Sequence, residues 1–263
     1  MKGRSDENGQ KMSEQLSIIS VMEDEQLFGP FFRDSSWDTW KIFLKGLFCL
    51  PMTESELKIF SEFTGRSALP QLVTEAWIIC GRKSGKSRIS ALIAVNLSCF
   101  RDYSGVLSAG EVGTVQVIAV DRRQARVIMR YIIGFLESVP MLAYKILKQT
   151  TESIELDNRI IIEIFTASSK STRGYTVVAC IADEIAFWKS DFSADPAREI
   201  IASILPSMAT VPGALLIALS SPWTRHGLLY DRYKKYYGKS DSSRLIWQSE
   251  TRKMSPKISE QII

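Results

Sequence analysis

The stretch Glu75–Ser98, EAWIICGRKSGKSRISALIAVNLS, decides the fold. An apolar run of strand length, Ala76–Cys80, leads into a short basic loop with two glycines, and a helical pattern begins at Lys86. A strand, loop and helix in this order surround a phosphate with backbone N–H groups of the loop and of the helix N-terminus. The sequence therefore predicts a phosphate loop, in which Lys86 contacts the β- and γ-phosphates of a nucleoside triphosphate and Ser87 holds Mg²⁺.

This loop departs from the usual G-x-x-x-x-G-K-[ST] pattern at its first position. Cys80 stands where that pattern has glycine, and the glycine follows one residue later at Gly81. A chance Gly-Lys-Ser in a basic turn is the alternative interpretation, and an acidic partner further along the chain would argue against it. The residues expected to contact the nucleotide are Gly81, Arg82, Lys83, Ser84, Gly85, Lys86 and Ser87.

The composition bounds the class of protein. A chain of 263 residues with 45% hydrophobic and 24% charged residues is typical of a soluble α/β domain, with or without appendages. The net charge of +4 permits contact with nucleic acid without establishing it. His226 is the one histidine, and the four cysteines are widely spaced, so a metal cluster or a disulfide framework is not expected. Without a long apolar run or a signal-like N-terminus, we expect an intracellular protein that does not enter a membrane.

The N-terminal third is predicted to be helical after a flexible arm. Residues 1–25 are polar and predict the arm, and residues 26–74 predict a helical subregion. Within it, apolar residues at helical spacing end at Pro51, and Thr53 with Glu56 forms a capping box for a second helix.

The connector before the first strand offers candidates for the base of a nucleotide. Arg66 and Gln71 are candidates for the adenine side of the site, and a polar connector without a ligand is the alternative.

The rest of the chain alternates strands with helices. Strand patterns occur at 114–120, 153–156, 160–166, 177–182 and 214–219, and a short one at 244–248. With helical patterns at 121–139 and 195–208, they predict right-handed crossovers. The fold class expected is therefore α/β, with a mostly parallel central sheet flanked by helices.

Polar residues follow two of the buried strands. Asp183 and Glu184 suit Mg²⁺ binding through water and polarisation of an attacking water, and an acidic helix start is the alternative. Their position about 100 residues after the phosphate loop favours the first interpretation. Ser220 and Ser221 can sense a γ-phosphate at the end of the next strand, although a turn before Pro222 would look the same.

Taken together, CGRKSGKS (80–87), TRG (172–174), CIADE (180–184) and LSSP (219–222) resemble the ATPase motor of tailed-bacteriophage large terminases. The similarity runs from Trp37 to Gln248 and implies a phosphate-loop NTPase of the additional-strand, catalytic-glutamate (ASCE) type. The resemblance implies that Lys86 and Ser87 are the Walker A pair and that Arg82 is the loop arginine. It also implies that Asp183 is the Walker B aspartate and Glu184 the catalytic glutamate. Ser220 and Ser221 would belong to the coupling motif.

The resemblance also implies a function and partners. It implies ATP hydrolysis with Mg²⁺ that powers the translocation of double-stranded DNA into a procapsid, in the cytoplasm of a bacterial host. The expected partners are the portal protein, the small terminase subunit and further copies in a ring on the portal, with a monomer when alone. Residues 75–225 would be the ATPase core and 226–263 a basic lid or linker. The nuclease domain of the family is not expected, because no acidic triad follows the coupling motif.

Three questions stay open on the sequence. The arginine that offsets charge in catalysis is either Arg82 within the subunit or one of Arg122, Arg123 and Arg126 across a subunit boundary. The basic, tyrosine-rich helix expected at 226–239 contacts DNA or a neighbour, or is an ordinary solvated surface. The alternatives to a packaging motor are a helicase-like ATPase and an assembly module that binds ATP with little turnover.

Overall fold

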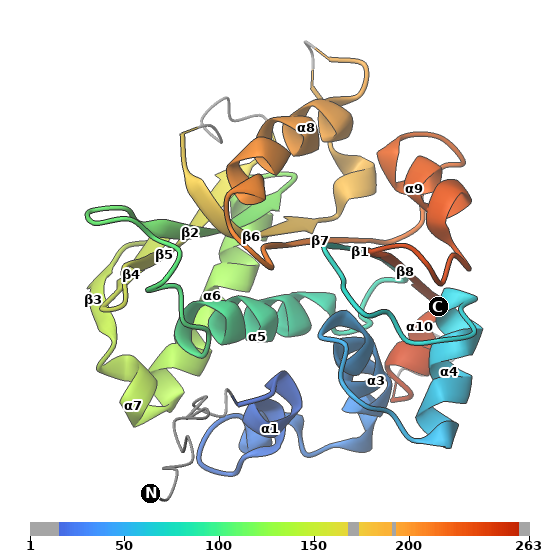
Figure 1. The fold of residues 1–263 in the computed structure, drawn as a ribbon, viewed down its shortest axis with the longest axis horizontal. Coiled ribbons are helices and arrows are strands. Elements are labelled where there is room, and N and C mark those ends of the chain that lie inside the picture. Colours follow the sequence, from blue (N-terminus) through green and yellow to red (C-terminus); the bar gives the residue numbers. More distant parts are fainter. Residues whose placement is uncertain (1–15, 168–173, 191–192, 258–263) are drawn as a thin grey trace, which may run out of the picture.

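A computed structural model describes residues 16–167, 174–190 and 193–257. Its centre is an eight-stranded sheet in the order β3-β4-β5-β2-β6-β7-β1-β8, with helices on both faces (Figure 1). The pairs from β5 through β8 are parallel, and only β3–β4 and β4–β5 are antiparallel, so the predicted fold class is confirmed. The strands are β1 Glu75–Cys80, β2 Gly113–Ala119, β3 Ile146–Gln149, β4 Ser153–Leu156, β5 Ile160–Thr166, β6 Thr176–Asp183, β7 Leu215–Ser220 and β8 Arg244–Ser249.

The helices form a layer on each side of this sheet. In Figure 1, α8 and α9 lie above the sheet, and α5 and α6 lie below it. The helix α1 lies beneath α5, whereas α3 and α4 lie beside α5 at the β8 end of the sheet. Within the described part of the chain, no helix has both the length and the apolar character needed to cross a bilayer. The helices are α1 Ile18–Glu23, α2 Gly29–Phe32, α3 Asp38–Leu47, α4 Glu54–Thr64, α5 Lys86–Cys99, α6 Arg122–Ser138, α7 Pro140–Ala143, α8 Pro196–Ala209, α9 Leu228–Tyr236 and α10 Thr251–Met254, with 3₁₀ turns η1 Ser35–Trp37 and η3 Ile185–Phe187.

The buried strands β1, β2, β6 and β7 are apolar almost throughout, because helices cover both faces of a parallel sheet. Their register brings the carboxyl ends together. Ile79 of β1 lies opposite Ser220 of β7, and Asp183 of β6 lies opposite Leu219 of β7. The chain therefore leaves β1, β6 and β7 at one edge of the sheet.

Two predicted boundaries differ from the structure. Ile18, Val21 and Met22 of α1 are buried, so the expected flexible arm does not extend to residue 25, and residues 1–15 lie outside the described residues. The short strand expected at 244–248, within the segment expected as a lid or linker, is β8 and pairs with β1 along its whole length, so the core sheet continues past residue 225. β3 was not predicted, because it is an exposed edge strand without a continuous apolar pattern.

Aromatic side chains attach the N-terminal helices to the sheet. The predicted capping box at Thr53 is present at the start of α4. The rings of Phe43 on α3 and of Phe60 and Phe63 on α4 all pack against Trp247 of β8, with centroids 5.0–6.3 Å apart. The helical subregion is thus part of the same packed body as the sheet.

Candidate nucleotide site

The phosphate loop joins β1 to α5 with two residues in the left-handed region of backbone conformation. Lys83 has φ 60° and Gly85 has φ 95°. Among the described residues, nothing accepts a hydrogen bond from the backbone N–H groups of Gly85, Lys86 and Ser87. Free N–H groups at a helix N-terminus form a binding site for an anion. The loop therefore has the local geometry that its sequence predicts.

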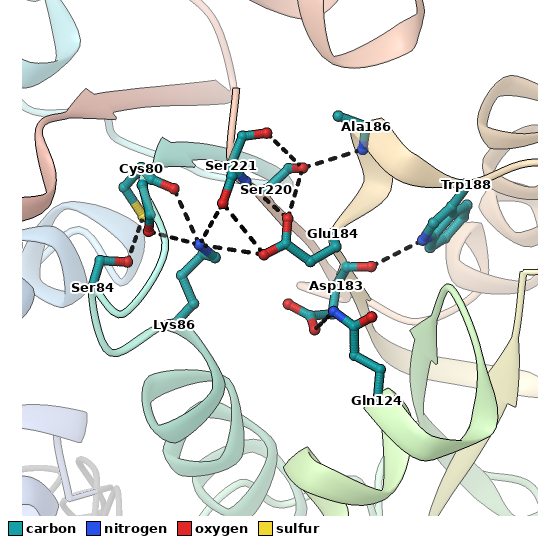
Figure 2. Close-up of polar contacts among 11 residues, drawn as sticks. Cys80, Ser84, Lys86, Gln124, Asp183, Glu184, Ala186, Trp188, Ser220 and Ser221 are labelled. Atoms are coloured by element: carbon teal, nitrogen blue, oxygen red, sulfur yellow. Dashed lines mark hydrogen bonds and ion pairs between the residues drawn. The ribbon is translucent and has the colours of Figure 1, made fainter. Parts of the chain in front are cut away.

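Lys86 connects the loop to the other strand ends. Its Nζ donates to the carbonyls of Cys80 at 3.1 Å and Gly81 at 2.9 Å, and to Oγ of Ser221 at 3.2 Å. It also lies 3.5 Å from Oε1 of Glu184, and only 7% of its side chain is exposed. Figure 2 shows this ammonium at the centre of the cluster.

Asp183 is buried at the end of β6 with one oxygen unpaired. Gln124 Nε2 donates to Oδ2 at 3.3 Å, and Trp188 Nε1 donates to the backbone carbonyl at 2.9 Å. Oδ1 is buried and has no hydrogen-bond partner among the described residues. Burial, and then the negative charge of Glu184, raise the pKa of Asp183 to about 6. A divalent cation would satisfy the unpaired oxygen and offset the buried charge, so this carboxylate fits Mg²⁺.

Glu184 turns toward the phosphate loop in a strained backbone conformation, with φ 49° and ψ 43°. The backbone N–H of Ser221 donates to Oε2 of Glu184 at 2.9 Å, and the Ser220 hydroxyl lies 3.2 Å from the same oxygen (Figure 2). The two serines singled out in the sequence thus hold the carboxylate of Glu184. Because β7 lies between β1 and β6, it brings these hydroxyls between the loop and the acids.

One cavity is lined by the phosphate loop and by Glu184. It has a volume of about 430 Å³, and two larger cavities of about 670 and 800 Å³ lie toward α9 and α10 and do not include Lys86 or Glu184. The chemistry, and not the volume, therefore identifies the candidate site. The smaller cavity is lined by Trp37, Arg82, Lys83, Ser84, Gly85, Lys86, Ser87, Arg88, Val127, Tyr131, Glu184 and Ser255.

The candidate arginines have different surroundings. Arg82 is exposed and lines the cavity beside the loop. Arg122 and Arg126, in the first turns of α6, form ion pairs with Glu152 at 3.3 and 3.1 Å, and Arg123 is exposed. The choice between the loop arginine and the α6 cluster stays a prediction. Thr172 and Arg173 of the TRG motif lie outside the described residues.

Arg66 and Gln71 are not brought to this site. Arg66 is 1% exposed, and its Nη2 donates to the carbonyls of Ser242 at 2.9 Å and Arg244 at 2.6 Å. Arg244 pairs with Glu75, at the opposite end of β1 from the phosphate loop. A strand of that length separates the two ends by about 17 Å, at about 3.3 Å per residue. Gln71 is exposed and precedes the same end, so the structure favours the polar-connector alternative.

The predicted basic aromatic helix is α9, and its side chains contact one another. Tyr230 and Tyr233 stack with centroids 6.5 Å apart, and Lys234 lies 5.8 Å from the Tyr230 ring. Arg232 lies over Trp77 and near the Glu75 carboxylate. These contacts favour the alternative of an amphipathic surface that anchors α9 to the sheet.

Sequence reasoning missed three residues that support the site. Gln124 and Trp188 hold Asp183, and the Trp40 indole N–H donates to the backbone carbonyl of Ser84 at 2.7 Å. Gln124 had a usable signal, because it lies in the first helical turn after a core strand. The partner of Trp40 is 44 residues away, and no local pattern indicates it.

The sheet order, the phosphate loop and the acids at the end of β6 together define the fold of a phosphate-loop NTPase of the ASCE type. In this fold an additional strand, here β7, separates the loop strand from the acidic strand. Among solved structures, this fold is shared with the large terminase of bacteriophage HK97, at a TM-score of 0.55 and 18% identity over 72% of this chain and 41% of that chain. The ATPase domain of the large terminase of Thermus phage P74-26 matches at a TM-score of 0.53 and 14% identity, over 82% of this chain and 87% of that domain.

This chain thus corresponds to less than half of the HK97 large terminase and to most of the P74-26 ATPase domain. At these identities, the likeness is one of fold. No protein-family model matches the sequence, and no curated protein matches it.

Proposed function

We propose that this chain hydrolyses ATP and acts as the motor domain of a large terminase, which moves double-stranded viral DNA into a procapsid. The observation that carries the proposal is that Lys86, Asp183, Glu184 and the two serines at the end of β7, Ser220 and Ser221, meet at one edge of the sheet. This constellation lies in the ASCE fold, which the described part of the chain shares with two terminase ATPase domains.

Each group has a role that follows from its position. Lys86 and the free loop N–H groups neutralise the β- and γ-phosphates. Asp183 and Ser87 would hold Mg²⁺, which supplies further neutralisation of phosphate charge. Glu184 orients and polarises the attacking water, because its carboxylate faces the cavity and is fixed by two serines.

Lys86 and Glu184 contact each other. A triphosphate that enters the loop competes with Glu184 for the ammonium, and this competition frees the carboxylate for water. Ser220 and Ser221 both contact Glu184, and Ser221 also contacts Lys86. The two serines are therefore placed to report that change to β7. An arginine then offsets the charge that develops on the γ-phosphate, from Arg82 in the same subunit or from Arg122, Arg123 or Arg126 of a neighbouring one.

The proposal extends to the setting of the motor. The partners would be double-stranded DNA, the portal protein, the small terminase subunit and other copies of this chain in a ring, and the site of action would be the procapsid portal in the bacterial cytoplasm. The two matched chains are terminase proteins, and this origin supports the proposal by analogy of fold alone.

ATP turnover tests the proposal directly. Wild type is expected to release phosphate from Mg²⁺–ATP, and Lys86→Ala is expected to lose both binding and turnover. Glu184→Gln should bind ATP yet fail to turn over, because the amide cannot polarise water. Lys145→Ala is the matched control, since Lys145 forms an ion pair with Asp157 far from the cavity. Turnover that persists in Glu184→Gln would contradict the assigned role of Glu184.

Adding double-stranded DNA and procapsids separates the motor from its alternatives. Stimulation by both, with DNA protected from nuclease inside the capsid, is the result expected for a packaging motor. Stimulation by single-stranded DNA together with unwinding would instead identify a helicase-like ATPase. ATP-dependent assembly with no turnover under any of these conditions would identify an assembly module.

A further inference from the structure

The N-terminal helices contact the phosphate loop through a buried hydrogen bond. The indole N–H of Trp40, on α3, donates to the backbone carbonyl of Ser84 at 2.7 Å. Trp40 has no exposed surface, and Ser84 is 1% exposed. A hydrogen bond between two such groups is costly to lose, because neither partner can turn to water instead. The contact joins segments that are 44 residues apart.

This bond fixes the orientation of one peptide in the loop. The C=O and N–H of a trans peptide lie in one plane and point in opposite directions. With the Ser84 carbonyl held by Trp40, the N–H of Gly85 points away from the indole. No described residue accepts from that N–H, so it is available to a phosphate oxygen.

Two further contacts of the same helical layer reach the same part of the loop. A Cβ at Gly85 would lie 3.0 Å from the Trp37 ring and 3.2 Å from the Trp40 indole nitrogen, so the two tryptophans cover the left-handed residue closely. The Arg88 guanidinium, in the first turn of α5, lies over the rings of Phe32 and Trp37 at 5.2 and 5.3 Å. The loop and the start of its helix therefore rest on aromatic side chains from outside the sheet.

We propose that Trp40 is a positioning residue for triphosphate binding, which holds the Ser84–Gly85 peptide so that the loop N–H groups face the phosphates before ligand arrives. This inference rests on the proposed function, because it assigns the same loop to a triphosphate. Trp40 acts through Ser84 and Gly85 and does not line the cavity itself. The energetic benefit is preorganisation, since a loop without this bond must be ordered when ligand binds.

Trp247 provides a matched control for this role. It also has no exposed surface, and both tryptophans pack edge-on against Phe43, at 5.7 Å for Trp40 and 5.5 Å for Trp247. The Trp247 indole donates to the sulfur of Met254 and not to the loop. Trp40→Phe and Trp247→Phe therefore remove equally buried indole groups from one aromatic cluster, and only the first removes a bond to the phosphate loop.

Calorimetric titration with ATP and with inorganic tripolyphosphate, both in EDTA so that no turnover occurs, tests the inference. For Trp40→Phe, the Kd of both ligands is expected to rise about 5- to 20-fold, because ligand binding must then order the loop peptide. For Trp247→Phe, both values should stay within about twofold of wild type. Thermal unfolding of both variants shows whether their losses of stability are comparable.

The outcomes distinguish this inference from the function on which it rests. Equal affinities in Trp40→Phe and Trp247→Phe, with wild type binding and Lys86→Ala not binding, would overturn the role of Trp40 alone. If wild type bound neither ligand, the phosphate-loop assignment would fail as well. If Trp40→Phe did not fold, Trp40→Met would replace it, because a flexible thioether adapts to an irregular gap in a core and also lacks the N–H. The same rise in Kd is expected for that variant.

Discussion

Replacing Asp183 with Asn tests the electrostatics of the site in the metal-free protein. The pKa of Asp183 is raised from 3.8 to about 6, mainly by burial and then by the charge of Glu184. In the unfolded chain, the same carboxyl titrates near its ordinary value of about 4. Between these two values, the folded protein holds a proton that the unfolded chain has released. The stability of wild type should therefore fall as the pH rises through this window, and rise again as the pH is lowered.

The size of the effect follows from the difference between the two pKa values. About two pH units correspond to about 3 kcal/mol, at about 1.4 kcal/mol per unit. Wild type carries this cost in full above about pH 6 and is free of it below about pH 4. Asp183→Asn cannot ionise, and its side-chain oxygen can still accept from Gln124. The stability of this variant relative to wild type should thus increase by about 3 kcal/mol between about pH 4 and pH 7.

Urea unfolding in EDTA, followed by circular dichroism from about pH 4 to pH 8 at constant ionic strength, measures this difference. Asp121→Asn is the control, because Asp121 is an exposed N-cap residue of α6 and Asn caps helices equally well. Its stability relative to wild type should change little across the range. If the free energies of unfolding of Asp183→Asn and wild type changed in parallel with pH, burial would not be destabilising the charged form of Asp183.

Three further substitutions test other parts of the structure. Arg66→Leu should lower the free energy of unfolding by about 1–3 kcal/mol, because two hydrogen bonds to backbone carbonyls are lost, and it should leave the Kd for ATP unchanged. A higher Kd for ATP would mean that Arg66 contributes to nucleotide binding. Arg126→Ala removes an exposed ion pair, so it should change the free energy of unfolding by less than about 1 kcal/mol and reduce ATP turnover only in the assembled motor. Full turnover in the assembled motor would exclude Arg126 as the catalytic arginine. Gly81→Ala should weaken ATP binding in calorimetry because the added Cβ clashes with Oγ1 of Thr251, and adding Thr251→Ala should partly restore the binding. If the double variant bound no better, the clash with Thr251 would not be the cause of the loss.

The strand-end residues could be predicted because their signals are local. Lys86 follows a strand and a glycine-containing loop, and Asp183 and Ser220 each end an apolar strand. A parallel sheet gathers such ends at one edge, so identifying the strands was enough to expect the groups to meet. The fold class followed from the same alternation of strands and helices.

Contacts between distant segments could not be predicted in this way. The bonds from Trp40 to Ser84 and from Gln124 to Asp183 span 44 and 59 residues, and they depend on how helices pack against the sheet. Arg66 was a candidate for the adenine side of the site because of its place in the chain, with a polar connector as the alternative. The structure uses it instead to hold the carbonyls before and within β8, a strand that lies some 180 residues further along the chain.

The displaced glycine of the phosphate loop has a physical explanation in one local contact and one distant contact. Cys80 is the last residue of β1, and its buried Sγ lies 3.2 Å from the Ser84 hydroxyl, so the thiol fills the base of the loop. Burial raises the pKa of this thiol, which therefore stays neutral beside the proposed phosphate site. At Gly81, by contrast, Thr251 of α10 leaves no room for a side chain. The loop thus needs glycine at its second position and not at its first. The cause is Thr251, in the segment after β8 that was expected to lie outside the core.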